Sequence, residues 1–286
     1  MIHELPLERR TLHGHFSRDL EPVLTIDSGD SVRFATPNAG WDLEDGTPFE
    51  PRSSPEDDGH ALAGPIEVRG SRTGQTLAVH IDEVVAGPSG VTLTKWPHRI
   101  DWELGATTGR ASTGHVVRLR PFLGVLGMPP AEPGIHSTIP PRPHGGNIDC
   151  KELVAGTTLY LPIPVDGALF SAGDGHAVQG DGEVCLTALE TCLKGTFELV
   201  LHKKMTLEMP RAITPTHYIT LGMDTDLDDA AKQALRDMIR WLVELQGWKP
   251  AEAYVFCSLA CDLHVTQLVD GNKGIHAMVR RDLLAA

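Results

Sequence analysis

The sequence lacks the features that mark several large protein classes. It has no run of 18 or more apolar residues, so we expect no membrane-spanning helix. Its first five residues show no basic stretch followed by an apolar run, so we expect no secretory signal and a cytoplasmic location. Positive charge is scarce, because 25 Lys and Arg stand against 38 Asp and Glu, for a net charge of -13. This balance disfavours nucleic acids and anionic membranes as partners, since phosphate groups demand a basic surface.

Cysteine is also scarce, and its five positions are odd in number and include no Cys-x-x-Cys pair. A thiolate zinc site and a complete set of disulfides are therefore not indicated, and reduced, mostly buried thiols are expected. The cysteines are Cys150, Cys185, Cys192, Cys257 and Cys261. Cys150 is a weak candidate for a nucleophile, because no adjacent histidine would lower its pKa.

Common catalytic motifs are missing as well. The chain has no Gly-x-Ser-x-Gly elbow, which disfavours an α/β-hydrolase triad. It also has no phosphate loop and no dinucleotide-binding fingerprint after a strand.

What the chain does have is a pattern of short, punctuated β-segments. Glycine (29) and proline (21) are scattered through it, and alternating or β-branched stretches lie between them. Strands are predicted at residues 23–26, 31–34, 76–81, 116–119 and 196–201. Short strands bounded by turn residues indicate a sandwich or a barrel. Residues 36–64, rich in Pro, Asp, Glu and Gly, form either an irregular loop that enters a site or interface, or a disordered loop.

One long helix is predicted at residues 227–245, where apolar residues recur at helical spacing. Asp226 and Asp228 favour its N-terminus, and Gly247 supplies a stop. A shorter helix is possible from Pro250 to about Cys261. The chain is therefore predicted to be mainly β, with a smaller α+β portion near its C-terminus.

Three pairs of polar residues are spaced by two positions. They are His80-x-Asp82, Asn147-x-Asp149 and Asp174-x-His176. Because residues i and i+2 of an extended chain share a face, each pair would present two ligands from one side of a strand. Carboxylate and imidazole groups suit zinc or another divalent metal in an open site. Three pairs exceed the needs of one ion, so some of these groups would support the ligands, or two ions would bind.

The densest polar stretch runs from Phe170 to Glu183, where glycines alternate with Asp, His, Gln and Glu. Glycine allows close approach of the backbone to a ligand, and the polar groups between would face a shared point. Glu183 is the candidate for the general base of a hydrolase. The alternatives are structural: Gly-Asp-Gly also makes tight turns, His80 could be an ordinary strand histidine, and Asn147 could cap a turn.

Several longer motifs resemble the acetamidase/formamidase family. They are Gly64-Pro-Ile-Glu-Val, Gly124-Val-Leu-Gly-Met, Gly145-Gly-Asn-Ile-Asp149, Gly156-Thr-Thr-Leu-Tyr-Leu-Pro162 and Gly173-Asp-Gly-His-Ala-Val-Gln-Gly-Asp-Gly-Glu183, with 253–270 similar to the family's C-terminal segment. The resemblance implies hydrolysis of a short linear amide of the formamide or acetamide type to a carboxylate and ammonia. It also implies a β-sandwich (1–120), a barrel-like middle that carries the site (121–210) and an α+β portion (211–286), usually in homo-oligomers.

The resemblance further implies site residues and a divalent ion, with zinc ahead of calcium. Asp82, Asn147, Asp149, Asp174, His176 and Glu183 occupy matching motif positions, and His80 completes the predicted metal ligands His80, Asp82, Asp174 and His176. Glu183 is assigned as the base, Asn147 as an oxyanion donor and Asp149 as the alternative base. The chain departs from the family at Pro143-His144, where His144 is an extra ligand or a rim residue. The other functions considered are hydrolysis of a different amide or urea-like compound, and metal or small-molecule binding without catalysis.

Overall fold

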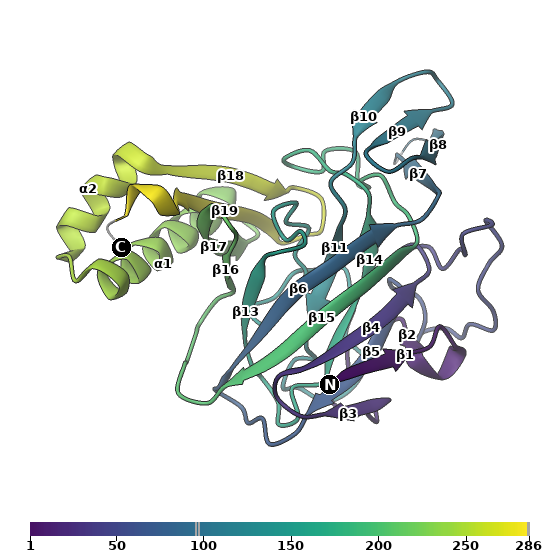
Figure 1. The fold of residues 1–286 in the computed structure, drawn as a ribbon, viewed down its shortest axis with the longest axis horizontal. Helices are drawn as coiled ribbons and strands as arrows, with labels where there is room; N and C mark the ends of the chain where they lie inside the picture. The colour runs from purple at the N-terminus through teal and green to yellow at the C-terminus, as the bar shows by residue number, and fades with distance from the viewer. Residues whose placement is uncertain (95, 97, 285–286) are drawn as a thin grey trace.

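The computed structural model describes residues 1–94, 96 and 98–284, and over these residues the chain is mainly β (Figure 1). Within the same residues the strands form three sheets, and two α-helices lie together at one end of the molecule. No helix in the described part of the chain is long and apolar enough to cross a bilayer. The predicted mainly β fold with a smaller α+β portion is confirmed.

The largest sheet, counted over the described residues, has nine strands. In order across the sheet they are β1 (Ile2–Leu5), β4 (Asp30–Thr36), β15 (Leu193–His202), β6 (Thr76–Ala86), β13 (Thr158–Pro162), β16 (Arg211–Ile213), β17 (His217–Asp224), β19 (Lys273–Arg280) and β18 (Cys261–Gln267). Strands β1 and β4 are parallel, and the other neighbours are antiparallel. This sheet therefore continues from the N-terminal strands into the C-terminal α+β portion.

A second sheet carries the glycine-rich motifs. It contains β12 (Gly145–Asn147), β11 (Phe122–Gly127), β14 (Phe170–His176), β5 (Leu62–Val68) and β2 (Leu12–His13), with β3 (Leu24–Ile26) also paired to β5. A separate antiparallel sheet projects at the top of Figure 1 and contains β7 (Ser89–Leu93), β8 (Arg99–Leu104), β9 (Thr108–Ala111) and β10 (Val116–Arg118). The short 3-10 helices are η1 (Arg9–Thr11) and η2 (Arg281–Leu283).

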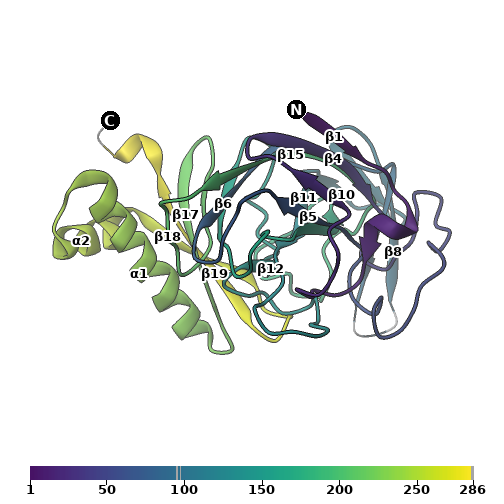
Figure 2. The ribbon, with the colours of Figure 1, turned by 90° about the horizontal axis from the view of Figure 1, so that it is seen from below.

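The main hydrophobic core lies between the two larger sheets, which curve around it (Figure 2). Val79 and Ile81 of β6 are buried there together with Leu123 of β11. Successive side chains of a strand point to opposite faces, so the alternation that buries Val79 and Ile81 turns His80 away from this core. The side chain of Asp82, two positions beyond His80, is exposed.

The helices form a second core with the C-terminal strands. Helix α1 (Leu227–Gln246) packs on β17 and β19, and α2 (Pro250–Ala260) packs beside it. A Cβ on Gly222 of β17 would lie 2.0 Å from the carbonyl oxygen of Ala230, so the close approach of α1 requires glycine there. Asp226 caps α1 by accepting two backbone N–H bonds, and Gly247 ends it with a φ of 67°. Both predicted helix boundaries are confirmed to within one residue.

The five predicted strand segments correspond to β3, β4, β6, β10 and β15, with boundaries that differ by a few residues. The chain segments 1–120 and 121–210 share both large sheets, because β14 pairs with β5 and β15 lies between β4 and β6. The C-terminal portion begins at β16, which starts at Arg211. The first two segments are therefore interleaved in one folded body.

Candidate active site

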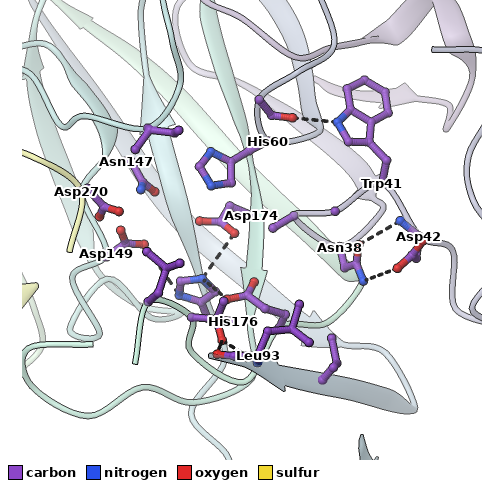
Figure 3. Close-up of a pocket in the computed structure, with 18 of the residues that line it drawn as sticks. Asn38, Trp41, Asp42, His60, Leu93, Asn147, Asp149, Asp174, His176 and Asp270 are labelled. Carbon is purple, nitrogen blue, oxygen red and sulfur yellow. Dashed lines mark hydrogen bonds and ion pairs between the residues drawn. The ribbon is translucent and has the colours of Figure 1, made fainter. Parts of the chain in front are cut away.

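A cavity of about 330 Å³ lies where the second sheet meets the loop before β5 and the tip of the β18–β19 hairpin (Figure 3). The loop of residues 36–64, which was expected either to enter a site or to be disordered, contributes Asn38 to Asp42 and Asp58 to His60 to its wall. The buried polar residues of the cavity are Asn147, Asp149, Asp174, His176, Glu183, Glu190 and Asp270. The cavity is at the lower end of the sizes found for small-molecule sites.

Strand β14 supplies the centre of the cavity through Asp174 and His176. The glycines that alternate with them are required by close packing on the other side of the strand. A Cβ on Gly173 would lie 2.1 Å from the carbonyl oxygen of Ala61, and one on Gly175 would lie 2.5 Å from that of Thr191. Asp174 itself has a φ of 63°, a conformation rare for a residue other than glycine and often found at functional sites.

Gly124 of β11 lies next to the acids of the cavity. The register of β11 and β14 pairs Leu123 with Gly175 and Val125 with Gly173, so Gly124 lies across from Asp174. A Cβ on Gly124 would lie 2.4 Å from Oδ1 of Asp149 and 2.4 Å from Oδ2 of Asp174. Two carboxylate oxygens therefore face the same small space above a residue that has no side chain.

His176 is held from both sides of its ring. Its Nε2 lies 3.3 Å from Oδ1 of Asp174 and 3.3 Å from Oε1 of Glu190, which is opposite His176 in an isolated β-bridge. Its Nδ1 lies 3.1 Å from Oε1 of Gln179. The amide nitrogen of Gln179 donates to the backbone oxygens of Asp149 and Thr266, at 2.8 and 3.3 Å. The oxygen of Gln179 must therefore accept from Nδ1–H of His176, which leaves Nε2 for the carboxylates.

The charges of the cavity are strongly coupled. Burial lowers the pKa of His176, but Glu190 and Asp174 together raise it well above its ordinary value. Burial alone would raise the pKa of Asp174, and the interactions with His176 and His60 instead hold it well below its usual range. One acid is thus ionised beside one imidazolium.

The remaining acids resist ionisation. Burial, and then the charge of Glu183, raises the pKa of Asp149 well above its ordinary value. Burial raises the pKa of Glu183 to about 9 and that of Asp270 to about 6, and it also raises the pKa of Glu190. Buried carboxyl groups in this number require either shared protons or a further cation to balance them.

The cavity offers ligand atoms for such a cation. Among the described residues, Oδ1 of Asp149, Oε2 of Glu190, Oδ2 of Asp270 and Oδ1 of Asn147 are buried without a hydrogen-bond partner. Two overlapping groups have ligand atoms within 4.8 Å of one another, namely Asp149–His176–Glu183 and Asp174–His176–Glu190. Carboxylate and imidazole groups around an open space match the donors of a divalent-metal site.

Five of the seven predicted site residues meet in this cavity. Asn147 and Asp149 come from the end of β12 and the residues after it, Asp174 and His176 from β14, and Glu183 from the turn beyond β14. The sequence motifs on which these residues were chosen therefore converge in space as expected. Their individual roles stay predictions.

His80 and Asp82, two of the predicted metal ligands, do not line the cavity. Nδ1 of His80 is 2.7 Å from Oγ1 of Thr158, a neighbour in the nine-stranded sheet, and Asp82 is exposed. The two residues are spaced as described, but their side chains do not point into the main core. His144 also lies outside the lining, with Nδ1 2.7 Å from the backbone oxygen of Met128.

Several cavity residues were missed by reasoning from the sequence. Glu190 and Asp270 belong to no paired motif, and Gly124 and His60 carry no recognisable ligand pattern. The available signals were weak: Gly124 begins one of the quoted motifs, and Asp270 ends the C-terminal segment. Nδ1 of His60 is 2.8 Å from Oγ1 of Thr138, and Figure 3 shows its ring beside Asp174.

The cysteines contribute no reactive group to the cavity lining. All five lie in the described residues and are free of disulfides, as expected. Burial raises the pKa of the Cys150 thiol to about 12. This thiol is therefore protonated at neutral pH, which disfavours it as a nucleophile.

The fold and the cavity together define a β-protein with a buried centre of carboxylates and one histidine. A model of the Acetamidase/Formamidase family matches residues 131–279, just over half of the chain. The chain belongs to this family.

Individual relatives agree with this assignment. The chain is 35% identical over 111 residues to the formamidase of Methylophilus methylotrophus, covering 35% of this chain and 27% of that protein. The solved acetamidase of Bacillus halodurans is similar with a TM-score of 0.87 and 29% identity, covering 98% of both chains. The acetamidase of Yersinia enterocolitica has a TM-score of 0.88 and 27% identity, covering 100% of this chain and 94% of that one. The chain spans between 12% and 57% of the length of the curated relatives that it matches.

Proposed function

We propose that the protein hydrolyses a short linear amide, of the formamide or acetamide type, to a carboxylate and ammonia. The family membership supports this reaction class, and the small cavity supports a small substrate. The observation that carries the proposal is the space above Gly124, which two carboxylate oxygens and His176 enclose. We propose that a divalent ion, zinc ahead of calcium, binds in this space.

The residues fit such an ion. Asp149 and Asp174 would hold it, because an oxygen of each lies 2.4 Å from the position that a Cβ on Gly124 would occupy. Nε2 of His176, which lies 3.3 Å from Oδ1 of Asp174, would be the third ligand. Oδ1 of Asp149 has no hydrogen-bond partner among the described residues, although it lies 3.8 Å from Nδ1 of His176. A bound divalent ion would polarise the amide carbonyl and ease deprotonation of the attacking water. Its positive charge would also favour the ionised forms of the surrounding carboxyl groups.

The other residues would carry the proton chemistry. Glu183 takes a proton from water as the water oxygen bonds to the amide carbon, and it delivers that proton to the nitrogen as the C–N bond breaks. The amide group of Asn147 donates a hydrogen bond to the carbonyl oxygen as negative charge develops on it. The products are a carboxylic acid, which ionises, and ammonia. Oε1 of Glu190 lies 3.3 Å from Nε2 of His176, the ring nitrogen that would bind the ion.

A pair of glycine variants tests the proposed site. Gly124→Ala places a methyl group between Asp149 and Asp174, whereas Gly180→Ala adds one where no atom lies within 4 Å. We expect Gly124→Ala to lose both metal content and ammonia release from formamide, acetamide and propionamide, and Gly180→Ala to keep both. Normal turnover by folded Gly124→Ala would contradict the placement of the chemistry. A wild-type protein that binds the ion yet releases no ammonia from these amides would contradict the reaction.

We further propose that the protein is a cytoplasmic homo-oligomer. Its five free cysteines suit a reducing compartment. Tyr254, Val255 and Leu259 of α2 are 60%, 61% and 82% exposed, an apolar surface that a second copy could cover. Light scattering coupled to gel filtration tests the assembly, and a monomer at micromolar concentration would contradict it.

A further inference from the structure

A second group of potential metal ligands lies outside the cavity, where the β18–β19 hairpin meets the turn after β14. His264 of β18 and His276 of β19 are directly paired across the hairpin. Nδ1 of His264 lies 3.0 Å from Oδ2 of Asp181, which comes from the turn. Ligand atoms of all three residues lie within 4.8 Å of one another. None of the three residues lines the cavity described above.

His276 is the least satisfied member of this group. It is fully buried, and its ring stacks on that of His264 with centroids 5.1 Å apart and planes 11° from parallel. Its Nδ1 is 2.8 Å from Oγ1 of Thr266, while its Nε2 has no partner among the described residues. A buried polar atom without a partner costs free energy, so Nε2 is positioned for a ligand.

Asp181 is oriented by a second neighbour. Nζ of Lys151 lies 2.7 Å from Oδ1 of Asp181, so Oδ2 is the oxygen that faces the two histidines. Oδ2 of Asp181 and Nδ1 of His264 share one proton in their hydrogen bond. When a cation displaces this proton to solvent, each of the two atoms has a lone pair that can bind the cation. The side chain of His264 is 34% exposed, which leaves it room to adjust.

We propose that Asp181, His264 and His276 bind a divalent transition-metal ion, best matched by Zn²⁺, at a site separate from the cavity. Two imidazoles and one carboxylate are a donor set typical of zinc, with the remaining position open to water. Lys151 supports the carboxylate from its other oxygen, in the way that neighbouring groups orient metal ligands.

An ion at this site would fasten the hairpin to the body of the protein. Asp181 and Lys151 belong to the segments around the second sheet, whereas both histidines belong to the hairpin whose tip carries Asp270 into the cavity. Thr266 connects the two regions, because its hydroxyl contacts His276 and its backbone oxygen accepts from Gln179. The second site therefore stabilises the position of one wall of the cavity without contributing an atom to it.

Counting bound zinc tests this proposal. The full chain, as purified, is incubated with excess ZnCl₂, passed into metal-free buffer and analysed for zinc per chain. The variants are Asp181→Asn and His264→Gln, at partly exposed positions where loss of folding is not expected. The control is His115→Gln, an exposed histidine of the segment between β9 and β10 whose Nδ1 lies 3.0 Å from Oγ1 of Thr113. The measured quantity is the difference in zinc per chain between each variant and wild type, so it does not depend on how many ions the cavity binds.

We expect both variants to bind one zinc ion fewer per chain than wild type and the control to match wild type. We also expect ZnCl₂ to raise the thermal unfolding midpoint of wild type more than that of either variant. Equal zinc content in all four proteins would overturn the proposal. Loss of every bound ion in a folded variant would also overturn it, because the group would then act on the cavity and hold no ion of its own.

Discussion

Strands β14 and β6 carry the same polar pattern in opposite settings. On β14, Asp174 and His176 are buried and lie 3.3 Å apart at their nearest charged atoms, within reach of Glu190. On β6, His80 is only partly buried and contacts the hydroxyl of Thr158, and Asp82 is exposed. In a regular strand a spacing of two residues places two side chains on one side, but it does not determine which side. On β6 the register with β15 also shifts at Asp82, where Ile81 pairs with Phe197 and Glu83 with Thr196.

The two strands also differ in the residue that lies between the two polar residues. On β6 this residue is Ile81, whose side chain occupies the main core and so turns the pair outward. On β14 it is Gly175, which packs against the backbone of Thr191 and leaves the polar side to the cavity. The intervening residue does not decide the outcome alone, because Asn147 and Asp149 have the core residue Ile148 between them and still line the cavity.

The largest effect is expected from the β14 pair. Asp174→Asn and His176→Gln each remove a proposed ligand, so bound metal and ammonia release should fall together. A metal ion contributes several kcal/mol of transition-state stabilisation, which corresponds to a loss of about 10³-fold or more in turnover. Metal analysis and an ammonia assay on the same preparation check this. Turnover within tenfold of wild type in a metal-free variant would contradict the assignment.

Glu183→Gln should have the next largest effect. It keeps the shape of the side chain but removes its basic carboxylate, so turnover should fall about 10²–10⁴-fold while the ion stays bound. The matched control is Glu198→Gln, because Glu198 is the carboxylate whose charge acts on Asp82 of the β6 pair. Loss of the ion in Glu183→Gln would make Glu183 a ligand. The base would then be sought among the other acids of the cavity.

A smaller effect is expected at Gln179, which orients His176 without facing the cavity centre. Gln179→Leu removes the acceptor for Nδ1–H and both donors to the backbone. Loss of such a supporting contact typically weakens metal affinity about 10–100-fold. Activity should therefore fall at limiting metal and recover at saturating metal. A loss that saturating metal does not restore would show that Gln179 acts on catalysis itself.

Substitution of either residue of the β6 pair should have almost no effect on activity or stability. His80→Gln and Asp82→Asn should leave turnover within about twofold and the free energy of unfolding within about 0.5 kcal/mol. Partial loss of solvation on the strand, followed by the charge of Glu198, raises the pKa of the exposed Asp82, so the folded state disfavours its ionised form. Asp82→Asn should therefore change stability in the favourable direction at neutral pH, as denaturant unfolding can measure. A large loss of activity would restore the pair to the site.

The sequence was sufficient for local features and for part of the site. Alternation predicted strands such as β4, β6 and β15, and the apolar spacing with Asp226 and Gly247 predicted α1. The resemblance and the glycine-rich motifs predicted five residues that meet in the cavity, Asn147, Asp149, Asp174, His176 and Glu183. They lie on β12, on β14 and in the segments that follow these two strands of one sheet.

What the sequence did not reveal depends on register and long-range contact. Glu190 reaches His176 through a single β-bridge, and Asp270 arrives on a hairpin 94 residues beyond His176. Neither of these long-range contacts produces a periodic pattern in the sequence. The role of Gly124 likewise follows from its position opposite Asp174, which only the pairing of β11 with β14 defines.

The position of Asp270 has a consequence for the timing of synthesis. A ribosome completes the other acids of the cavity long before it reaches residue 270, so a nascent chain has a cavity that lacks one wall. The unfinished cavity also lacks the acid that faces Asp149, and the pKa values of its carboxyl groups would differ accordingly. The complete set of buried acids therefore exists only when the C-terminal hairpin has been synthesised and lies against the second sheet.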